Sequence, residues 1–263
     1  MNLKKRFFAF GCSYTNWRLN PTWADFIGIN FQEYYNLGKA GACNTYIMNQ
    51  LIETNEKIQF NQETDVVIVA LSGFGRFSYL EAPPKNAPFG YVWNTSGDIL
   101  FKNPGHTQTA KLLANEIYNY TWAAYNSWIA IKVIKSILTS KNIEHKIIMA
   151  TDNSHYLTDS DVLDLNRGIN TSDDITSKIK NIYDTLDITE TIDEFRLDYM
   201  IMNGGHTNEH PNKEIHFEYI SKYFPEFVTE KSKNLSNIDT TNLIDSWELE
   251  LTNRITNLND IPN

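Results

Sequence analysis

The stretch Asp65-Val-Val-Ile-Val-Ala-Leu71 lies in the first third of this chain of 263 residues. After its first residue it is continuously apolar and rich in β-branched side chains, without the polar–apolar alternation of a half-exposed strand. The stretch therefore predicts a central strand that is buried on both faces. Such strands belong to parallel sheets that helices cover on both sides.

Further strands and helices are expected to alternate on either side of this strand. Short apolar runs predict strands at Arg6–Gly11, Glu33–Leu37 and His145–Ala150, and helical spacing or a preceding proline predicts helices at Thr22–Phe31, Thr45–Phe60 and Thr107–Thr139. This alternation predicts an α/β fold with a doubly wound parallel sheet. Ligands of such sheets bind beyond the carboxyl ends of the strands, so the loops after Gly11, Leu37, Leu71 and Ala150 are the places to look for a site.

The rest of the chain has weaker patterns. Residues 72–105 hold four of the eight prolines and predict a long loop or small subdomain. Residues 152–200 are rich in Asp, Thr and Ser and predict an insertion of short helices and loops. A last helix is expected at Pro211–Phe224, followed by a polar tail with a helical pattern around Ile244–Ile255. We expect one domain over residues 1–225, with insertions at about 73–105 and 152–200, and a polar, helical extension over 226–263 packed on the same domain.

Composition and charge exclude several classes of protein. The chain carries 23 Lys and Arg against 32 Asp and Glu, a formal net charge of −9, and 41% of its residues are hydrophobic, which is enough to build a core. Because it has no block of basic residues, neither nucleic acid nor an anionic membrane surface is expected as a partner. The oligomeric state is left open.

The expected location is cytoplasmic or virion-associated. The two cysteines, Cys12 and Cys43, have neither the number for a disulfide framework nor the spacing of zinc ligands. The start of the chain imitates a signal peptide, but its apolar run at Phe7–Phe10 is shorter than the roughly 7 to 15 residues that a secretory segment needs. No stretch reaches the roughly 18 apolar residues of a membrane span. We therefore expect no signal peptide and no transmembrane segment.

Three short motifs follow predicted elements. Ser13 comes directly after the first strand in Gly11-Cys-Ser, two glycines lie in Asn36-Leu-Gly38-Lys-Ala-Gly41 after the second, and His210 precedes a proline before the last predicted helix. Each motif alone is common in structural roles: a serine as a turn residue, glycines in an ordinary turn, and a histidine at a helix start. Their order along the chain makes them informative.

In this order the three motifs resemble those of the SGNH, or GDSL-type, hydrolase family, over residues 6–72 and 203–220. The short, degenerate blocks are similar to those of phage-encoded members. The resemblance implies a flavodoxin-like three-layer α/β/α sandwich and an esterase that needs no cofactor and no metal. It places Ser13 as the nucleophile, His210 as the general base, and the backbone N–H groups of Ser13 and Gly41 in the oxyanion hole. Since this site spans most of the chain, it supports a single domain.

The chemistry of these residue types fits those roles. A serine hydroxyl needs a base within hydrogen-bond reach to become a nucleophile, and histidine titrates near neutrality. The tetrahedral oxyanion needs preorganised donors, which a glycine turn offers without steric hindrance. The expected substrate is a small acyl ester, with a carbohydrate O-acetyl ester as the preferred class.

The chain departs from the family pattern in two places. The family has an Asn as third oxyanion donor after the central strand, where this chain has Phe74 in Ser72-Gly-Phe-Gly-Arg76. Ser72, Arg76 or Asn44 can fill that place, and Ser72, Phe74 and Arg76 are expected to line the substrate site. The family also has an Asp three residues before its His, where this chain has Thr207. The nearest replacements are Asn208 and Glu209, which makes the site a Ser-His dyad or a modified triad.

These departures keep other functions open. One alternative is a catalytically weakened protein of this fold that binds a glycan or a protein partner. Another is an acyltransferase, in which a sugar hydroxyl instead of water attacks the acyl-enzyme. His206, His210 and His216 with Glu209 can also be read as a metal site, although their spacing is not that of the H-E-x-x-H motif.

Overall fold

The computed structural model describes residues 5–17, 19–74, 76–81, 92–98, 120–151, 153, 172–203, 210–238, 251 and 254–256. Within these residues the chain forms an α/β fold with a five-stranded sheet in the order β6-β3-β1-β2-β7. Every neighbouring pair in this sheet is parallel. Its strands are β1 (Arg6–Phe10), β2 (Glu33–Asn36), β3 (Asp65–Leu71), β6 (Glu144–Met149) and β7 (Arg254–Ile255).

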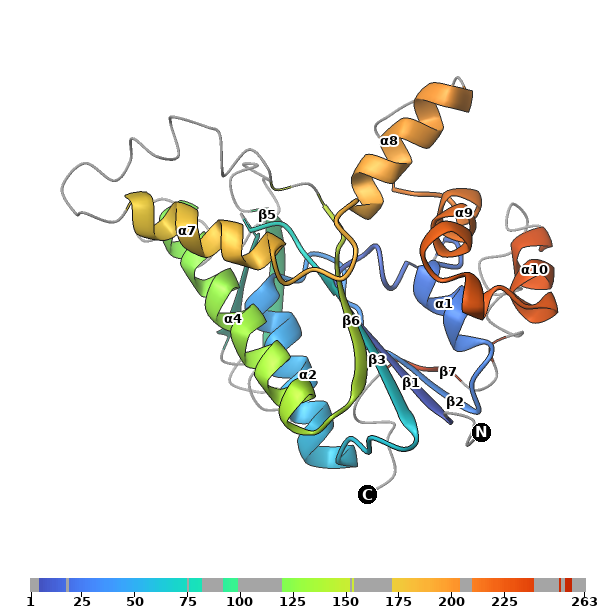
Figure 1. Cartoon of the computed structure of the whole chain (residues 1–263), viewed down its shortest axis with the longest axis horizontal. Helices are drawn as coiled ribbons and strands as arrows, with labels where there is room; N and C mark the ends of the chain where they lie inside the picture. Colours follow the sequence, from blue (N-terminus) through green and yellow to red (C-terminus); the bar gives the residue numbers. More distant parts are fainter. Residues whose placement is uncertain are drawn as a thin grey trace.

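Helices cover both faces of this sheet (Figure 1), which gives the three layers of a flavodoxin-like sandwich. On one face lie α2 (Asn44–Ile58), α4 (Tyr120–Ser140) and α7 (Ser172–Tyr183), which contact one another in that order. On the other face lie α1 (Trp23–Gly28), α9 (Lys213–Tyr223) and α10 (Glu230–Asn237), and α8 (Ile192–Asn203) packs against α9. A short 3-10 turn, η1 (Pro225–Phe227), joins α9 to α10.

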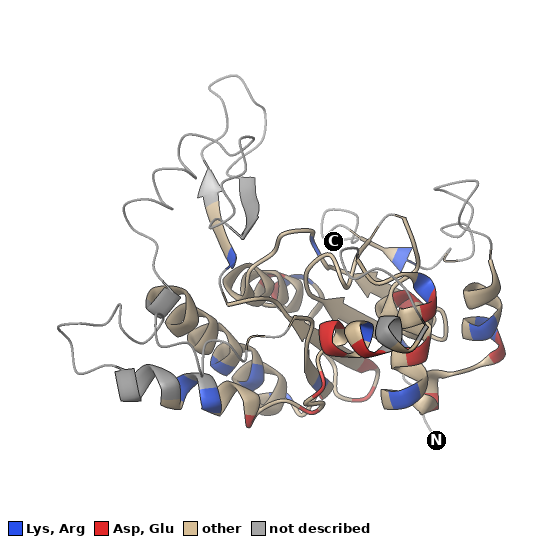
Figure 2. Ribbon diagram, turned by 90° about the horizontal axis from the view of Figure 1, so that it is seen from above, with Lys and Arg blue, Asp and Glu red and all other residues tan. Residues whose placement is uncertain are grey.

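The core explains why the sheet forms where it does. All seven residues of β3 are buried, as its unbroken apolar sequence predicts. On β1, Phe7 stacks on Tyr34 of β2 with ring centroids 5.5 Å apart, and Phe8 stacks on Tyr35 at 4.5 Å. Each of the five strands begins with a charged residue, and beyond these first residues the strands contain only one further Lys, Arg, Asp or Glu, which is Lys146. Figure 2 shows many of the other charged residues on the helices and loops around the sheet.

The order in which the strands are connected determines where a ligand site is expected. The chain runs from β1 through α1 to β2 on one side, then through α2 to β3 on the opposite side of β1. The direction of winding therefore reverses between β1 and β3. In doubly wound sheets, ligands bind beyond the carboxyl ends of the strands at such a reversal. The loops after Phe10 and Leu71 meet there.

The sequence predictions for the main elements agree with the structure, with differences at the ends of the chain. Residues 72–105 contain an antiparallel pair of strands, β4 (Arg76–Glu81) and β5 (Val92–Asp98). Of the helix expected over 107–139, the described residues show α4 from Tyr120 onward. Pro211–Phe224 does hold a helix, but α10 follows it. The helical pattern expected up to Ile255 is wrong at Arg254–Ile255, because these residues pair with Tyr34 and Tyr35 as an edge strand. No helix in the described ranges is long and apolar enough to cross a membrane.

Candidate active site

Ser13 lies in a single tight turn that follows β1. The carbonyl of Cys12 accepts hydrogen bonds from Thr15 N at 3.0 Å and Asn16 N at 3.2 Å, so the backbone curls around the serine. Gly11 makes this possible, because a Cβ built on it would lie only 2.0 Å from Thr15 Oγ1. The turn leaves Ser13 largely buried, with 4% of its surface exposed. Its hydroxyl is thus held at the carboxyl edge of the sheet.

His210 approaches this hydroxyl from the other end of the chain. Its Nε2 lies 2.8 Å from Ser13 Oγ, within hydrogen-bond distance, although the two residues are 197 positions apart. Pro211 follows directly, and the side chain of Asn212 accepts a hydrogen bond from Ile215 N at 3.0 Å and caps α9. The capped helix start fixes the backbone next to His210. The structure thus brings together the two residues that the resemblance implies as nucleophile and base.

Two aromatic residues of the same turn hold the imidazole. The ring of Trp17 stacks on it face to face, with centroids 4.0 Å apart and planes 6° apart. Tyr14 meets it edge to face at 5.3 Å. His210 is nevertheless exposed to solvent overall, although Trp17 covers one face of its ring. Sequence reasoning missed both aromatic partners, although their positions beside Ser13 in the sequence were a usable signal.

Charged residues around His210 act on its pKa. Partial burial lowers this pKa below the ordinary value of 6.5, and the positive charges of Arg76 and Arg196 lower it further, whereas Asp193 raises it. The imidazole is therefore neutral at pH 7 and able to accept a proton. Asp193 was not predicted from the sequence. Its carboxylate accepts hydrogen bonds from Tyr14 Oη at 3.0 Å and from Arg196 Nε at 2.9 Å.

Asp193 reaches this place because α8 starts beside the sheet. Its backbone N–H donates to Ala150 O at 3.1 Å, directly after β6. Ala150 N in turn donates to Leu71 O at 2.8 Å, which continues the pairing of β6 with β3. The start of α8 is thus tied to the same sheet edge as Ser13. No motif in residues 152–200 points to the hydrogen bond between Asp193 and Tyr14, which joins residues 179 positions apart.

The glycine turn after β2 packs directly against the Ser13 turn. Lys39 N donates to Gly11 O at 3.0 Å, and Asn16 Nδ2 donates to Gly38 O at 3.0 Å. Gly41 has a φ of 75°, a left-handed conformation that glycine adopts without strain. The role of the Gly41 and Ser13 backbone N–H groups as oxyanion donors stays a prediction of the resemblance.

Asn44, the predicted side-chain oxyanion donor, is fully buried and holds the end of β3. Its Oδ1 accepts from Ser72 N at 2.8 Å, and its Nδ2 lies 3.0 Å from Ser72 O and 3.2 Å from Ser127 Oγ. In this structure its amide is therefore used to join α2 to the loop after β3. The ring of Phe74, predicted to line the substrate site, lies in the hydrophobic core with no exposed surface.

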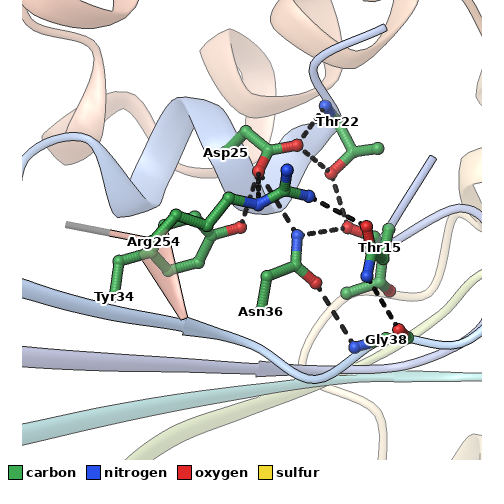
Figure 3. Close-up of polar contacts among 8 residues, drawn as sticks. Thr15, Thr22, Asp25, Tyr34, Asn36, Gly38 and Arg254 are labelled. Carbon is green, nitrogen blue, oxygen red and sulfur yellow. Dashed lines mark hydrogen bonds and ion pairs between the residues drawn. The ribbon is translucent and has the colours of Figure 1, made fainter. Parts of the chain in front are cut away.

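A buried polar network supports the Ser13 turn from the side of α1 and β7 (Figure 3). We call it the Asp25 cluster, and its members are Thr22, Asp25, Tyr34, Asn36 and Arg254. Asp25 Oδ1 accepts from Tyr34 Oη at 2.9 Å and pairs with Arg254 Nε at 3.1 Å, while its Oδ2 accepts from Thr22 N at 2.8 Å. Asp25 has no exposed surface. Removing one partner from a buried ion pair of this kind is strongly destabilising, because it leaves a buried charge unpaired.

The Asp25 cluster holds the backbone just after Ser13. The carbonyl of Thr15 accepts from Thr22 Oγ1 at 2.6 Å and from Asn36 Nδ2 at 2.9 Å, as Figure 3 shows. Arg254 Nη2 also donates to Asn16 Oδ1 at 2.9 Å. The turn that carries the serine is therefore braced by the end of β2 and by β7, two neighbouring strands that lie far apart in the sequence. The only sequence signal for this cluster was Thr22 three residues before Asp25 at a helix start.

Several predicted residues remain to be placed. Thr207, Asn208 and Glu209, the predicted position of a triad acid and its replacements, lie outside the described residues, as does His206. His216 is fully buried in α9, and burial lowers its pKa to about 3, so it stays neutral. In the described part of the chain, no group of three His, Cys, Asp or Glu side chains could hold a metal ion. Cys12 and Cys43 are both buried as free thiols.

Comparison of the chain with models of protein families gives no match. A comparison with curated proteins gives none either. The resemblance to the SGNH hydrolases accordingly rests on the motifs in the sequence alone.

Proposed function

We propose that this protein is a serine hydrolase of small acyl esters, in which Ser13 is the nucleophile and His210 the general base. The observation that carries the proposal is the 2.8 Å distance between Ser13 Oγ and His210 Nε2. It joins the two residue types needed for acyl transfer at the sheet edge where ligands of such folds bind. The low pKa of His210 supports it, since only a neutral imidazole can take the serine proton.

The reaction proceeds in two steps. As Ser13 Oγ attacks the ester carbonyl, its proton passes to His210 Nε2, and that proton then leaves with the alcohol as the carbon–oxygen bond of the ester breaks. Water next attacks the acyl-serine and gives a proton to His210, which returns it to Ser13 Oγ as the carboxylic acid is released. The stacked ring of Trp17 keeps Nε2 directed at the serine throughout. Donors in the Gly38–Gly41 turn and at Ser13 are assigned to the oxyanion by the family resemblance.

Asp193 takes part of the role of a triad acid in this proposal. In serine hydrolases an acid orients the histidine and stabilises the imidazolium that forms during the reaction. Here Asp193 favours the protonated imidazole through space, while its hydrogen bond from Tyr14 places that ring against His210. The carboxylate acts through its charge and through Tyr14, so we assign it as a positioning residue.

A fluorophosphonate probe tests the nucleophile directly. The probe should label the native protein at one site, and peptide mass mapping should place the label on Ser13. His210→Ala should slow labelling by about 100-fold or more, because general-base assistance is worth roughly that factor. A folded protein that is not labelled at Ser13 would favour the alternative of a binding protein without catalysis. An added sugar acceptor that diverts the acyl group from water would instead indicate the acyltransferase.

The pH profile tests the electrostatics of His210. Because its pKa is lowered, the acid limb of kcat/KM for ester hydrolysis should lie below pH 6.5. Arg76→Gln removes a positive charge that disfavours the imidazolium, so the pKa should rise and the limb should move to higher pH. Asp193→Asn removes the charge that favours it, so the limb should move to lower pH.

The control for these two variants is Lys146→Gln, which removes a cation from a surface ion pair with Glu226 and should leave the profile unchanged. Shifts of the same sign in Arg76→Gln and Asp193→Asn would contradict the assignment of His210 as the titrating base.

A further inference from the structure

Arg76 is the first residue after the tight turn that follows β3. Arg76 N donates to Gly73 O at 3.2 Å, which closes the turn. The side chain then folds back along Gly73, since a Cβ built on that glycine would lie 3.8 Å from both Arg76 Cγ and Arg76 Nε. The guanidinium is therefore kept partly buried over the carboxyl end of β3. Since β3 pairs with β1, this is the edge from which the Ser13 turn arises.

Arg76 differs from the other arginines of the described residues in having no carboxylate partner. Arg6 pairs with Asp65, Arg196 with Asp193 and Arg254 with Asp25. Arg76 forms no ion pair within the described ranges, and its Nη1 is buried there without a hydrogen-bond partner. A buried guanidinium nitrogen without an acceptor is costly. In a chain with nine excess acidic charges, this lack of a partner is unexpected and points to an acceptor supplied from outside.

A buried hydroxyl that has no partner among the described residues lies beside the same glycine. Thr151 Oγ1 lies 3.4 Å from the Cβ position built on Gly73, and it too is buried without a partner in the described part of the chain. Ser72, which precedes Gly73, is fully buried and its hydroxyl has no partner there. The loops after β3 and β6 thus bring one guanidinium and the Thr151 hydroxyl to one place. A cation with a neighbouring hydroxyl suits an anionic oxygen group.

We propose that Arg76, with Thr151 beside it, binds an anionic group of the substrate next to Ser13 and His210, so that the ester which this protein hydrolyses is an acidic one. The inference rests on the proposed hydrolase function and names its substrate class. The effect of the Arg76 charge on His210 supports it, because the guanidinium must lie within electrostatic reach of the reacting pair. The net charge of −9 accordingly does not exclude an anionic substrate, since the local charge here is positive.

Matched esters test this proposal. One pair is 4-acetoxybenzoate and its neutral methyl ester, with the anion on the alcohol side, and the other is mono-4-nitrophenyl succinate and 4-nitrophenyl butyrate, with the anion on the acyl side. In at least one pair the native protein should have a higher kcat/KM for the anionic ester. At a pH well above the acid limb, Arg76→Gln should lower that value by about 10- to 100-fold, the worth of a charge-assisted hydrogen bond, and should lower the value for the neutral ester much less. Arg76→Lys should retain part of the preference.

The outcomes separate this inference from the proposed function. Equal losses on anionic and neutral esters in Arg76→Gln would overturn it and assign Arg76 to the oxyanion. Turnover without any charge preference would overturn it while leaving the hydrolase intact. If none of the esters is turned over, binding of 4-acetoxybenzoate and of mono-4-nitrophenyl succinate is measured on Ser13→Ala by ligand-observed NMR. Binding that is lost in Ser13→Ala/Arg76→Gln but kept in Ser13→Ala/Lys146→Gln supports the anion site, and binding that does not depend on Arg76 overturns it.

Discussion

Replacing Ser13 by Ala should lower kcat for the hydrolysis of a chromogenic acetyl ester by at least about 10,000-fold. Removal of the nucleophile from a serine hydrolase leaves only the rate that substrate binding and oxyanion donors provide. The hydroxyl is held in a turn closed by Cys12 O, 2.8 Å from His210 Nε2, and this geometry is what the substitution cancels. Steady-state kinetics on purified protein, with circular dichroism to confirm the fold, measure the effect.

The double variant gives the sharper form of this prediction. If Ser13 and His210 act as one unit, Ser13→Ala/His210→Ala should be no slower than Ser13→Ala alone, because the effects of such residues are not additive. Ser140→Ala, which removes an exposed hydroxyl at the end of α4, is the matched control and should keep full activity. A Ser13→Ala protein with more than a tenth of the native activity would remove Ser13 from the mechanism.

Replacing Asp25 by Ala should lower the free energy of unfolding by about 3–5 kcal/mol, as is usual when one partner of a buried ion pair is removed. The substitution leaves Arg254 buried without its carboxylate and removes the acceptor for Tyr34 Oη and Thr22 N. Urea denaturation followed by circular dichroism measures the change. Such a loss is a large part of the stability of an ordinary domain, which is roughly 5–15 kcal/mol.

A double-mutant cycle with Arg254→Met tests whether the two charges depend on each other. The double variant should be less destabilised than the sum of the single variants, since it leaves neither charge unpaired. Glu230→Gln, which breaks an exposed pair with Lys233, should change stability by less than about 1 kcal/mol. A similarly small effect in Asp25→Ala would show that the cluster is not an anchor.

The parts of the fold that the sequence predicted are those with a strong local signal. Continuous apolar residues predicted β3 with its observed bounds, and helical spacing predicted α2 to within two residues. Strand β7 was missed because two residues in a polar tail carry no period, and they become a strand only by pairing with β2. The winding order that places Ser13 beside the end of β3 is a property of the whole sheet and has no local signal.

The site residues that could be predicted are likewise those that lie in a recognisable sequence motif. The resemblance predicted that Ser13 and His210 lie together, since each follows a recognisable motif, and the structure places them in contact. Asp193 and Arg196 could not be predicted, because they come from a segment without periodicity and matter only through their position near Tyr14 and His210. Whether the backbone of Gly41 binds an oxyanion stays a prediction.

The hydrogen bond from Arg254 to Asn16 implies that the candidate site is completed late in translation. The ribosome makes the turn around Ser13 first, but the histidine that contacts it and the arginine that braces it come more than 190 residues later. The nascent chain therefore carries the proposed nucleophile for most of its translation without the proposed base or the arginine that braces the turn. Under the proposed function, esterase activity should appear only after β7 has emerged from the ribosome, so its first appearance during cell-free translation would report that β7 has joined the sheet.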